Sequence, residues 1–102
     1  CELTRMERVA FSNTGTEAVM TAIRIARAAT KRYKIVMFSG SYHGHFDGTL
    51  VKVRELDGKL QTVPLTCGVP QSIVEDVLVL DYGNPESLEV IKAHKSELAA
   101  VL

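Results

Sequence analysis

The stretch Phe11-Ser12-Asn13-Thr14-Gly15-Thr16-Glu17-Ala18-Val19-Met20 joins a short apolar run to a long helical pattern. The apolar run, residues 8–12, predicts a strand. After Glu17, apolar residues recur at helical spacing, which predicts a helix that ends near Lys31 or Arg32. Residues 34–38 form a second apolar run of strand length, so the sequence predicts a β-α-β unit here.

Further strand and helix signals follow along the chain. Asp57-Gly58 lies between two short strand-like segments and is a dipeptide typical of tight hairpin turns. Asn84-Pro85-Glu86 matches the start of a helix whose apolar face carries Leu88 and Ile91. This order predicts the α/β class, with a mostly parallel sheet, flanking helices and a β-hairpin. The strands expected after residue 38 are residues 49–54, 59–63, 77–80 and 98–102.

The composition is that of an ordinary globular domain and excludes several partners. The 102 residues include 12 Lys and Arg against 12 Asp and Glu, and 46% of them are hydrophobic. With zero net charge and no run of like charges, the chain has no electrostatic basis for binding nucleic acid or an anionic membrane surface. No stretch approaches the roughly 20 apolar residues of a membrane span, so we expect a cytoplasmic protein.

The two ends of the chain suggest that it is part of a larger domain. It begins with Cys1 and ends on the apolar run of residues 98–102, with no turn signal after it. Such a run is typical of a strand inside a sheet. We therefore expect residues 1–102 to be one incomplete domain, truncated at both ends, and the alternative is a complete chain with an exposed tail.

The junction between residues 12 and 17 admits two interpretations. The start of a helix carries free N–H groups and the positive end of the helix dipole, so it can bind a phosphate. Gly15 would let an anion approach the backbone, and the hydroxyls of Thr14 and Thr16 would add donors. Alternatively, Thr14 and Glu17 have the spacing of a capping box, which stabilises a helix without binding a ligand.

A second candidate lies in the loop after residues 34–38. In residues 41–47 an aromatic ring could stack on a flat heterocycle, and a neighbouring imidazole could position that heterocycle or move a proton. Ligands of open α/β sheets bind beyond the carboxyl ends of the strands, so this loop and the Thr14-Gly15-Thr16 junction could share one ligand. Two alternatives remain: His43, His45 and Asp47 as metal ligands, or purely structural roles for all of these residues.

Three other residues carry weaker signals. Cys67 lacks the surroundings of a known nucleophile and is interpreted as a packed thiol. Asp81, at the end of a predicted strand, could be functional or could cap a turn. His94 lies near the end of a predicted helix, where a cation is favourable.

Taken together, the motifs resemble class III pyridoxal-phosphate aminotransferases, in the branch that contains glutamate-1-semialdehyde aminomutase. The resemblance rests on residues 11–20, the helix after them, residues 34–38 and Tyr42-His43-Gly44-His45, and it extends through Gly68-Val69-Pro70 to the end of the chain. The sequence of residues 38–48 is also similar to that of the aminotransferase domains of microcystin-type hybrid polyketide/nonribosomal peptide synthetases.

This resemblance implies the large domain of a fold-type I, aspartate aminotransferase-like enzyme that binds pyridoxal 5′-phosphate and works as a homodimer. By position, Gly15 and Thr16, with Thr14 beside them, would hold the cofactor phosphate. Tyr42 would stack on the pyridine ring, with His43 and Glu17 as supporting residues. The family normally has Ser where Thr14 stands, and the substitution keeps the hydroxyl.

The resemblance also implies two residues that have no match in this chain. They are a lysine that forms a Schiff base with the cofactor and an Asp that pairs with its ring nitrogen. In this family both come from strands that follow the one ending at Leu102. We therefore expect the chain to hold the cofactor but to be inactive alone.

The implied activity is transfer of an amino group from a donor amino acid to a carbonyl substrate. In a synthetase, this acceptor would be a β-keto intermediate on an acyl or peptidyl carrier protein, in polyketide/nonribosomal peptide (toxin) biosynthesis. One alternative is a free-standing glutamate-1-semialdehyde 2,1-aminomutase. Another is a non-catalytic phosphate-binding module.

Overall fold

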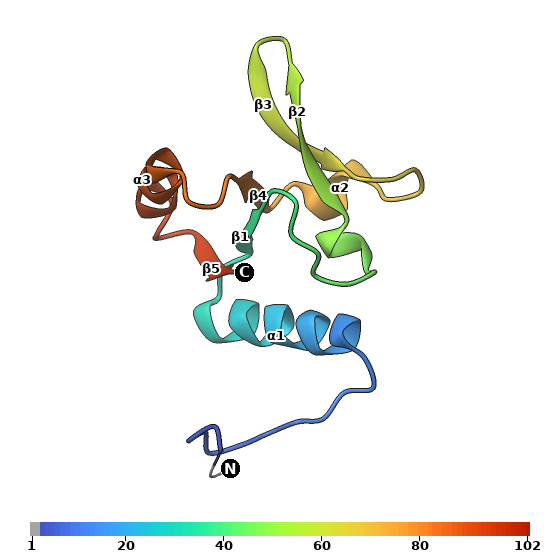
Figure 1. The fold of residues 1–102 in the computed structure, drawn as a ribbon, viewed down its shortest axis with the longest axis vertical. Coiled ribbons are helices and arrows are strands. Elements are labelled where there is room, and N and C mark those ends of the chain that lie inside the picture. The colour runs from blue at the N-terminus through green and yellow to red at the C-terminus, as the bar shows by residue number, and fades with distance from the viewer. Residues whose placement is uncertain (1–2) are drawn as a thin grey trace.

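A three-stranded parallel sheet lies at the centre of the structure (Figure 1), a computed structural model that describes residues 3–102. Its strands are β4 (Val77–Leu80), β1 (Lys34–Phe38) and β5 (Leu98–Val101), in that order across the sheet. β1 pairs in parallel with both neighbours, and Phe38 at its end lies opposite Leu80 of β4. The expected α/β class with a parallel sheet is therefore confirmed, and the carboxyl ends of β1 and β4 lie at one edge.

The first helix, α1 (Gly15–Thr30), lies on one side of this sheet, and a hairpin extends from the other side (Figure 1). The end of α1 agrees with the prediction, because Lys31 adopts a left-handed conformation with φ 56° and ends the helix. Ile23 is the buried residue of α1. It packs in one cluster with Ile35, Met37 and Val77 of the sheet.

The strand expected at residues 8–12 is not formed, so the first half of the predicted β-α-β unit is wrong. This segment runs apart from the three-stranded sheet (Figure 1), and Phe11 is 93% exposed. A strand needs a hydrogen-bonded neighbour, and none of the strands among residues 3–102 pairs with this segment. Its apolar composition alone does not supply one.

The predicted hairpin is confirmed. Strands β2 (Val51–Leu56) and β3 (Lys59–Pro64) pair antiparallel, with Leu56 opposite Lys59. Asp57 and Gly58 between them both have positive φ, 52° and 74°, as a two-residue type I′ turn requires. At its base the hairpin is tied to the sheet, because Thr62 Oγ1 donates to the Val77 carbonyl at 2.6 Å.

The short elements connect the hairpin to the strands. A 3₁₀ turn, η1 (Asp47–Thr49), precedes β2, and α2 (Gln71–Val74) precedes β4. Neither was predicted, because each is a single turn and lacks a periodic pattern.

Helix α3 (Pro85–Ala93) starts as predicted, with Asn84 Oδ1 accepting the Glu86 N–H at 2.9 Å. Its expected apolar face does not pack against the core: Leu88 is 52% exposed, and the buried residue of α3 is Ser87. A short helix at the edge of a sheet has only a narrow surface to pack on. Sequence periodicity therefore identified the helix but not the face that it buries.

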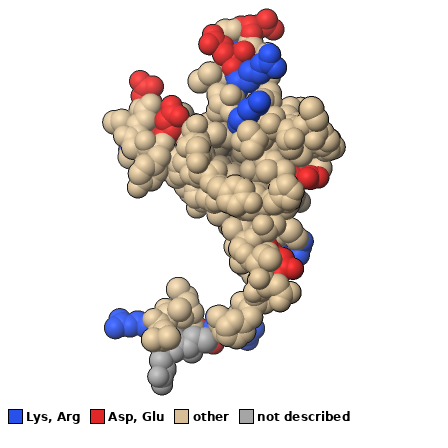
Figure 2. All heavy atoms as spheres, turned by 45° about the vertical axis from the view of Figure 1, so that its right-hand side comes forward, with Lys and Arg blue, Asp and Glu red and all other residues tan. Residues whose placement is uncertain are grey.

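The described residues contain no helix long and apolar enough to cross a membrane. On the face drawn in Figure 2, basic and acidic side chains lie next to each other on the hairpin, and no large surface of one charge is visible. This distribution agrees with the zero net charge of the sequence.

Candidate functional site

Helix α1 begins with a complete capping box. The Glu17 N–H donates to Thr14 Oγ1 at 3.2 Å, and the N–H groups of Asn13 and Thr14 donate to Glu17 Oε2 at 2.7 and 3.3 Å. The capping interpretation of this junction is therefore confirmed. The capping box is compatible with phosphate binding at the same junction. The N–H groups of Gly15 and Thr16 have no carbonyl partner within a regular helix and are available to an anion.

The loop after β1 reaches the start of α1 and is fastened to it. The His45 N–H donates to Thr16 Oγ1 at 3.0 Å, a contact between residues 29 positions apart. Gly44 precedes His45, is buried, and has φ 102°. Residues 42–45, which follow the carboxyl end of β1, therefore lie against the first turn of α1.

Helix start and loop together line a cavity of about 240 Å³. Three of the four predicted cofactor residues line it: Gly15 and Thr16 from the helix start, and Tyr42 from the loop. Thr14 does not line the cavity, and Glu17 faces Asn13 and Thr14 instead. The full lining is Gly15, Thr16, Val19, Tyr42, His43 and Gly44.

Two observations show that this cavity suits a ligand. A Cβ built on Gly15 meets no atom within 4 Å, so the space in front of the helix start is open. His43 Nε2 is buried and has no hydrogen-bond partner among the described residues, and an unpaired buried polar atom typically costs about 1–3 kcal/mol. The structural role considered for His43, a hydrogen bond to backbone, is not seen at this nitrogen.

The same cavity has the chemistry that pyridoxal 5′-phosphate needs. A phosphate needs N–H and O–H donors at a positive end of a dipole, which the first turn of α1 provides. A flat heterocycle needs an aromatic face, and the Tyr42 side chain is available because the residue is 77% exposed. The residues present therefore fit this cofactor.

The other candidates lie elsewhere or do not form a site. No three His, Cys, Asp or Glu side chains among residues 3–102 lie close enough to hold a metal ion, and this includes His43, His45 and Asp47. Cys67 is exposed, which corrects its interpretation as a packed thiol. It lies in an irregular segment between β3 and α2, where no core covers it.

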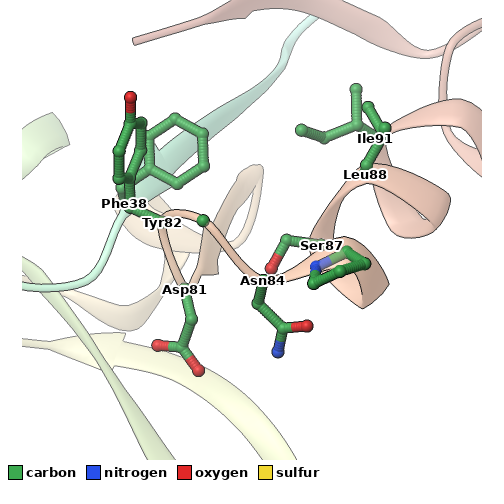
Figure 3. Close-up of a pocket in the computed structure, with 9 residues that line it drawn as sticks. Phe38, Asp81, Tyr82, Asn84, Ser87, Leu88 and Ile91 are labelled. Atoms are coloured by element: carbon green, nitrogen blue, oxygen red, sulfur yellow. The ribbon is translucent and has the colours of Figure 1, made fainter.

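Asp81 lines a different hollow, of about 470 Å³, between the end of β4 and α3 (Figure 3). Its walls are mainly apolar: Phe38 and Tyr82 form one side, and Leu88 and Ile91 the other (Figure 3). The Asp81 backbone carbonyl accepts the Asn84 N–H at 3.5 Å. This is a backbone turn contact, and it does not show the side-chain cap considered for this residue. None of the residues that line the Tyr42 cavity lines this hollow.

Comparison with known proteins assigns the chain to a family. The family described as "Aminotransferase class-III" matches residues 1–102, the whole chain. The chain belongs to the class-III aminotransferases. Within this family, one relative is the glutamate-1-semialdehyde 2,1-aminomutase of Clostridium acetobutylicum, which is 46% identical over 99 residues. The match covers 95% of this chain but 23% of the relative, so the chain spans about a quarter of the curated relatives it matches.

Solved structures of aminotransferases share the fold. An omega-transaminase from Sphaerobacter thermophilus has a TM-score of 0.81 and 39% identity, over 96% of this chain and 24% of its own. A transaminase with PLP bound has a TM-score of 0.78 and 41% identity, over 93% of this chain and 22% of its own. A β-phenylalanine aminotransferase from Variovorax paradoxus has a TM-score of 0.63 and 33% identity, over 96% of this chain and 20% of its own. This class-III chain therefore has the fold-type I architecture that was expected.

Sequence reasoning missed two residues of the cavity, Val19 and Gly44. Val19 belongs to the apolar residues at helical spacing; it packs half-buried against the core cluster and also lines the cavity. Gly44 was treated as a loop residue. Its place between two histidines gave no signal of the close contact with Thr16, which depends on the path of the loop after β1.

Proposed function

We propose that this class-III chain holds the pyridoxal 5′-phosphate of an aminotransferase. The observation that carries the proposal is the cavity in which Gly15 and Thr16, at the start of α1, meet Tyr42 and His43. An anion site and an exposed aromatic ring lie there side by side. The solved transaminase with PLP bound supports the same cofactor.

Each residue has a separate task in this proposal. The N–H groups of Gly15 and Thr16 and the Thr16 hydroxyl donate to phosphate oxygens, and Tyr42 contacts one face of the ring. Thr14 lies beside this group; its hydroxyl oxygen accepts the Glu17 N–H, and the hydroxyl hydrogen remains free to donate. His43 and Glu17 support the loop and the helix start.

The chemistry that the cofactor supplies when bound is amino-group transfer: the donor amino acid leaves as a 2-oxo acid and the acceptor carbonyl becomes an amine. No lysine lines the cavity, so the residue that holds the cofactor covalently comes from outside this chain. We therefore take residues 1–102 to be part of a larger domain that works as a homodimer and that is inactive without its remaining part. The proposal that the domain is larger is supported by the match to the Clostridium acetobutylicum relative, because this chain covers only 23% of that protein.

For the acceptor we propose a β-keto intermediate bound to a carrier protein in polyketide/nonribosomal peptide biosynthesis. The support is the wording of residues 38–48 and the β-amino acid substrate in the name of the Variovorax paradoxus aminotransferase. The test supplies the intact protein with a carrier-bound β-keto chain and amino acids carrying a labelled nitrogen. Label in the carrier-bound product supports the proposal, and label only in products of free acceptors contradicts it.

The cofactor proposal is tested with Gly15→Leu in the intact protein. The space in front of Gly15 is open and its φ is not positive, so a larger side chain fits the helix but occupies the phosphate position. We expect at least about tenfold weaker retention of pyridoxal 5′-phosphate, followed by absorbance after gel filtration. Ala28→Leu, at an exposed position of the same helix, should retain it fully. Unchanged retention in a folded Gly15→Leu protein would contradict the proposal.

The aminomutase alternative is favoured by the 46% identity to the Clostridium acetobutylicum enzyme. An aminomutase moves the amine within one molecule and needs no separate donor. Incubation with glutamate-1-semialdehyde and a labelled amino acid therefore separates the two functions. Conversion without incorporation of label identifies the aminomutase, and incorporation that depends on the donor identifies the transferase.

A further inference from the structure

The Thr16 hydroxyl lies between the two parts of the proposed cofactor site. Its oxygen accepts the His45 N–H at 3.0 Å, and the residue lines the cavity where the phosphate would bind. A hydroxyl has one hydrogen to donate and can accept through its oxygen at the same time. The bond to His45 therefore leaves the Thr16 hydrogen free for a phosphate oxygen.

Gly44 allows this contact because it has no side chain. A Cβ at this position would lie 2.8 Å from both Thr16 Cα and Thr16 Oγ1, which is closer than such atoms can approach. The loop is also held from the other side, where the Thr49 hydroxyl shares its one hydrogen between the Phe46 carbonyl at 3.0 Å and the Gly44 carbonyl at 3.4 Å. The loop is thus fixed against the helix on one side and against η1 on the other.

We propose that Thr16 is a positioning residue that couples phosphate binding to the placement of Tyr42. This inference rests on the proposed cofactor site and adds a link between its two halves. A hydroxyl that donates to an anion becomes a stronger acceptor, because successive hydrogen bonds polarise one another. Phosphate at the helix start therefore strengthens the bond to the His45 N–H, which holds residues 42–45, with the Tyr42 ring, over the cavity.

The first test uses no cofactor. In the apoprotein of the intact enzyme, hydrogen exchange at the His45 amide should be about five- to tenfold faster in Thr16→Val than in wild type, since the acceptor is lost. Thr16→Ser should restore the wild-type rate. Thr66→Val, an exposed threonine outside the cavity, should leave it unchanged. An unchanged His45 rate in Thr16→Val overturns the inference.

Inorganic phosphate then tests the coupling itself. It should slow exchange at His45 severalfold in wild type and in Thr16→Ser, but not in Thr16→Val. No slowing in wild type, at phosphate concentrations that inhibit cofactor binding, overturns the coupling. Failure of wild type to bind pyridoxal 5′-phosphate at all is a different result, which contradicts the proposed function and not the link between Thr16 and the loop.

A double-mutant cycle measures whether Thr16 acts through Tyr42. The dissociation constant of pyridoxal 5′-phosphate is compared in wild type, Thr16→Val, Tyr42→Leu and the double variant. If Thr16 positions Tyr42, Thr16→Val weakens cofactor binding about tenfold when it is made in the wild-type protein. Made in the Tyr42→Leu protein, the same substitution weakens binding only about two- to threefold. Effects that multiply fully in the double variant mean that Thr16 contacts only the phosphate, and they overturn the inference.

Two glycine variants separate the clash from backbone strain. Gly44→Ala introduces the contact with Thr16 at a positive φ, whereas Gly58→Ala has a positive φ of 74° and no atom within 4 Å of the new Cβ. We expect Gly44→Ala to raise exchange at His45 and to weaken cofactor binding about tenfold, and Gly58→Ala to change neither. Equal effects of both variants would show that the contact with Thr16 is unimportant.

Discussion

The carboxylate of Glu97 lies between the side chains of Lys34 and His94 just before β5, at the edge of the sheet opposite the Tyr42 cavity. Lys34 Nζ contacts Glu97 Oε2 at 2.7 Å and His94 Nδ1 contacts it at 3.0 Å. The hydrogen bonds from Lys34 and then His94 lower the pKa of Glu97 from 4.5 to about 2. The contacts of Glu97 with Lys34 and His94 connect α3 and the residues before β5 to the start of β1. The Lys34–Glu97 pair is half-exposed, so salt should screen most of its effect on stability.

This shift predicts how stability depends on pH. A carboxyl whose pKa is lower in the folded state stabilises the fold above its unfolded pKa of about 4.5, and this stabilisation is lost as the pH falls toward 2. We expect Glu97→Gln to lower the unfolding midpoint of the intact protein at pH 7, with a difference that shrinks below pH 4.5. The midpoints are compared in low salt across this range, with the exposed pair residue Glu89→Gln as control. A difference that grows on acidification would contradict the assignment.

The elements that form from local signals alone could be predicted from the sequence. The capping box of α1, the Asp57-Gly58 turn and the Asn84 cap each depend on side chains within a few residues of the backbone groups that they bind. The strand at residues 8–12 could not be judged in this way, because a strand exists only when another strand pairs with it. The buried face of α3 depends likewise on its neighbours.

The same distinction applies to the candidate site. Gly15, Thr16 and Tyr42 are predicted from residue types that suit a phosphate and a ring and from the resemblance to class III aminotransferases. The structure brings all three to one cavity, and their roles toward the cofactor stay a prediction. Gly44 and the bond from His45 to Thr16 were missed, because they result from a loop that returns to the helix start after 29 residues. Thr14 was assigned to the phosphate, and its observed partner is the Glu17 N–H.

The capping box gives a prediction at the level of helix α1. Thr14→Ala removes the acceptor of the Glu17 N–H and should lower the free energy of unfolding by about 1 kcal/mol. Thr14→Asn should restore most of this loss, because Asn caps a helix equally well. Chemical denaturation of the intact protein measures both. A loss in Thr14→Asn as large as in Thr14→Ala would mean that the threonine stabilises the helix in another way.

As a whole, the 102 residues bury few apolar side chains. The buried hydrophobic residues in the described part of the chain are Ile23, Ile35, Val36, Met37, Val74, Val77 and Leu98. The radius of gyration is 14.6 Å, against about 13 Å for a compact domain of this length. The long dimension of 50 Å runs from the segment before α1 to the tip of the hairpin (Figure 1), and neither end adds to the core.

This small core predicts that residues 1–102 alone are not cooperatively folded. Burial of so few side chains does not offset the entropy of ordering about 100 residues, so we expect a broad thermal transition. The matched variants are Ile35→Ala, fully buried, and Ile25→Ala, 61% exposed. In a folded chain Ile35→Ala alone would cost about 2–5 kcal/mol, whereas in an unfolded ensemble the two variants behave alike. Calorimetry of the isolated chain distinguishes these cases. A sharp two-state transition of a monomer, abolished by Ile35→Ala only, would show that the chain is a self-sufficient module.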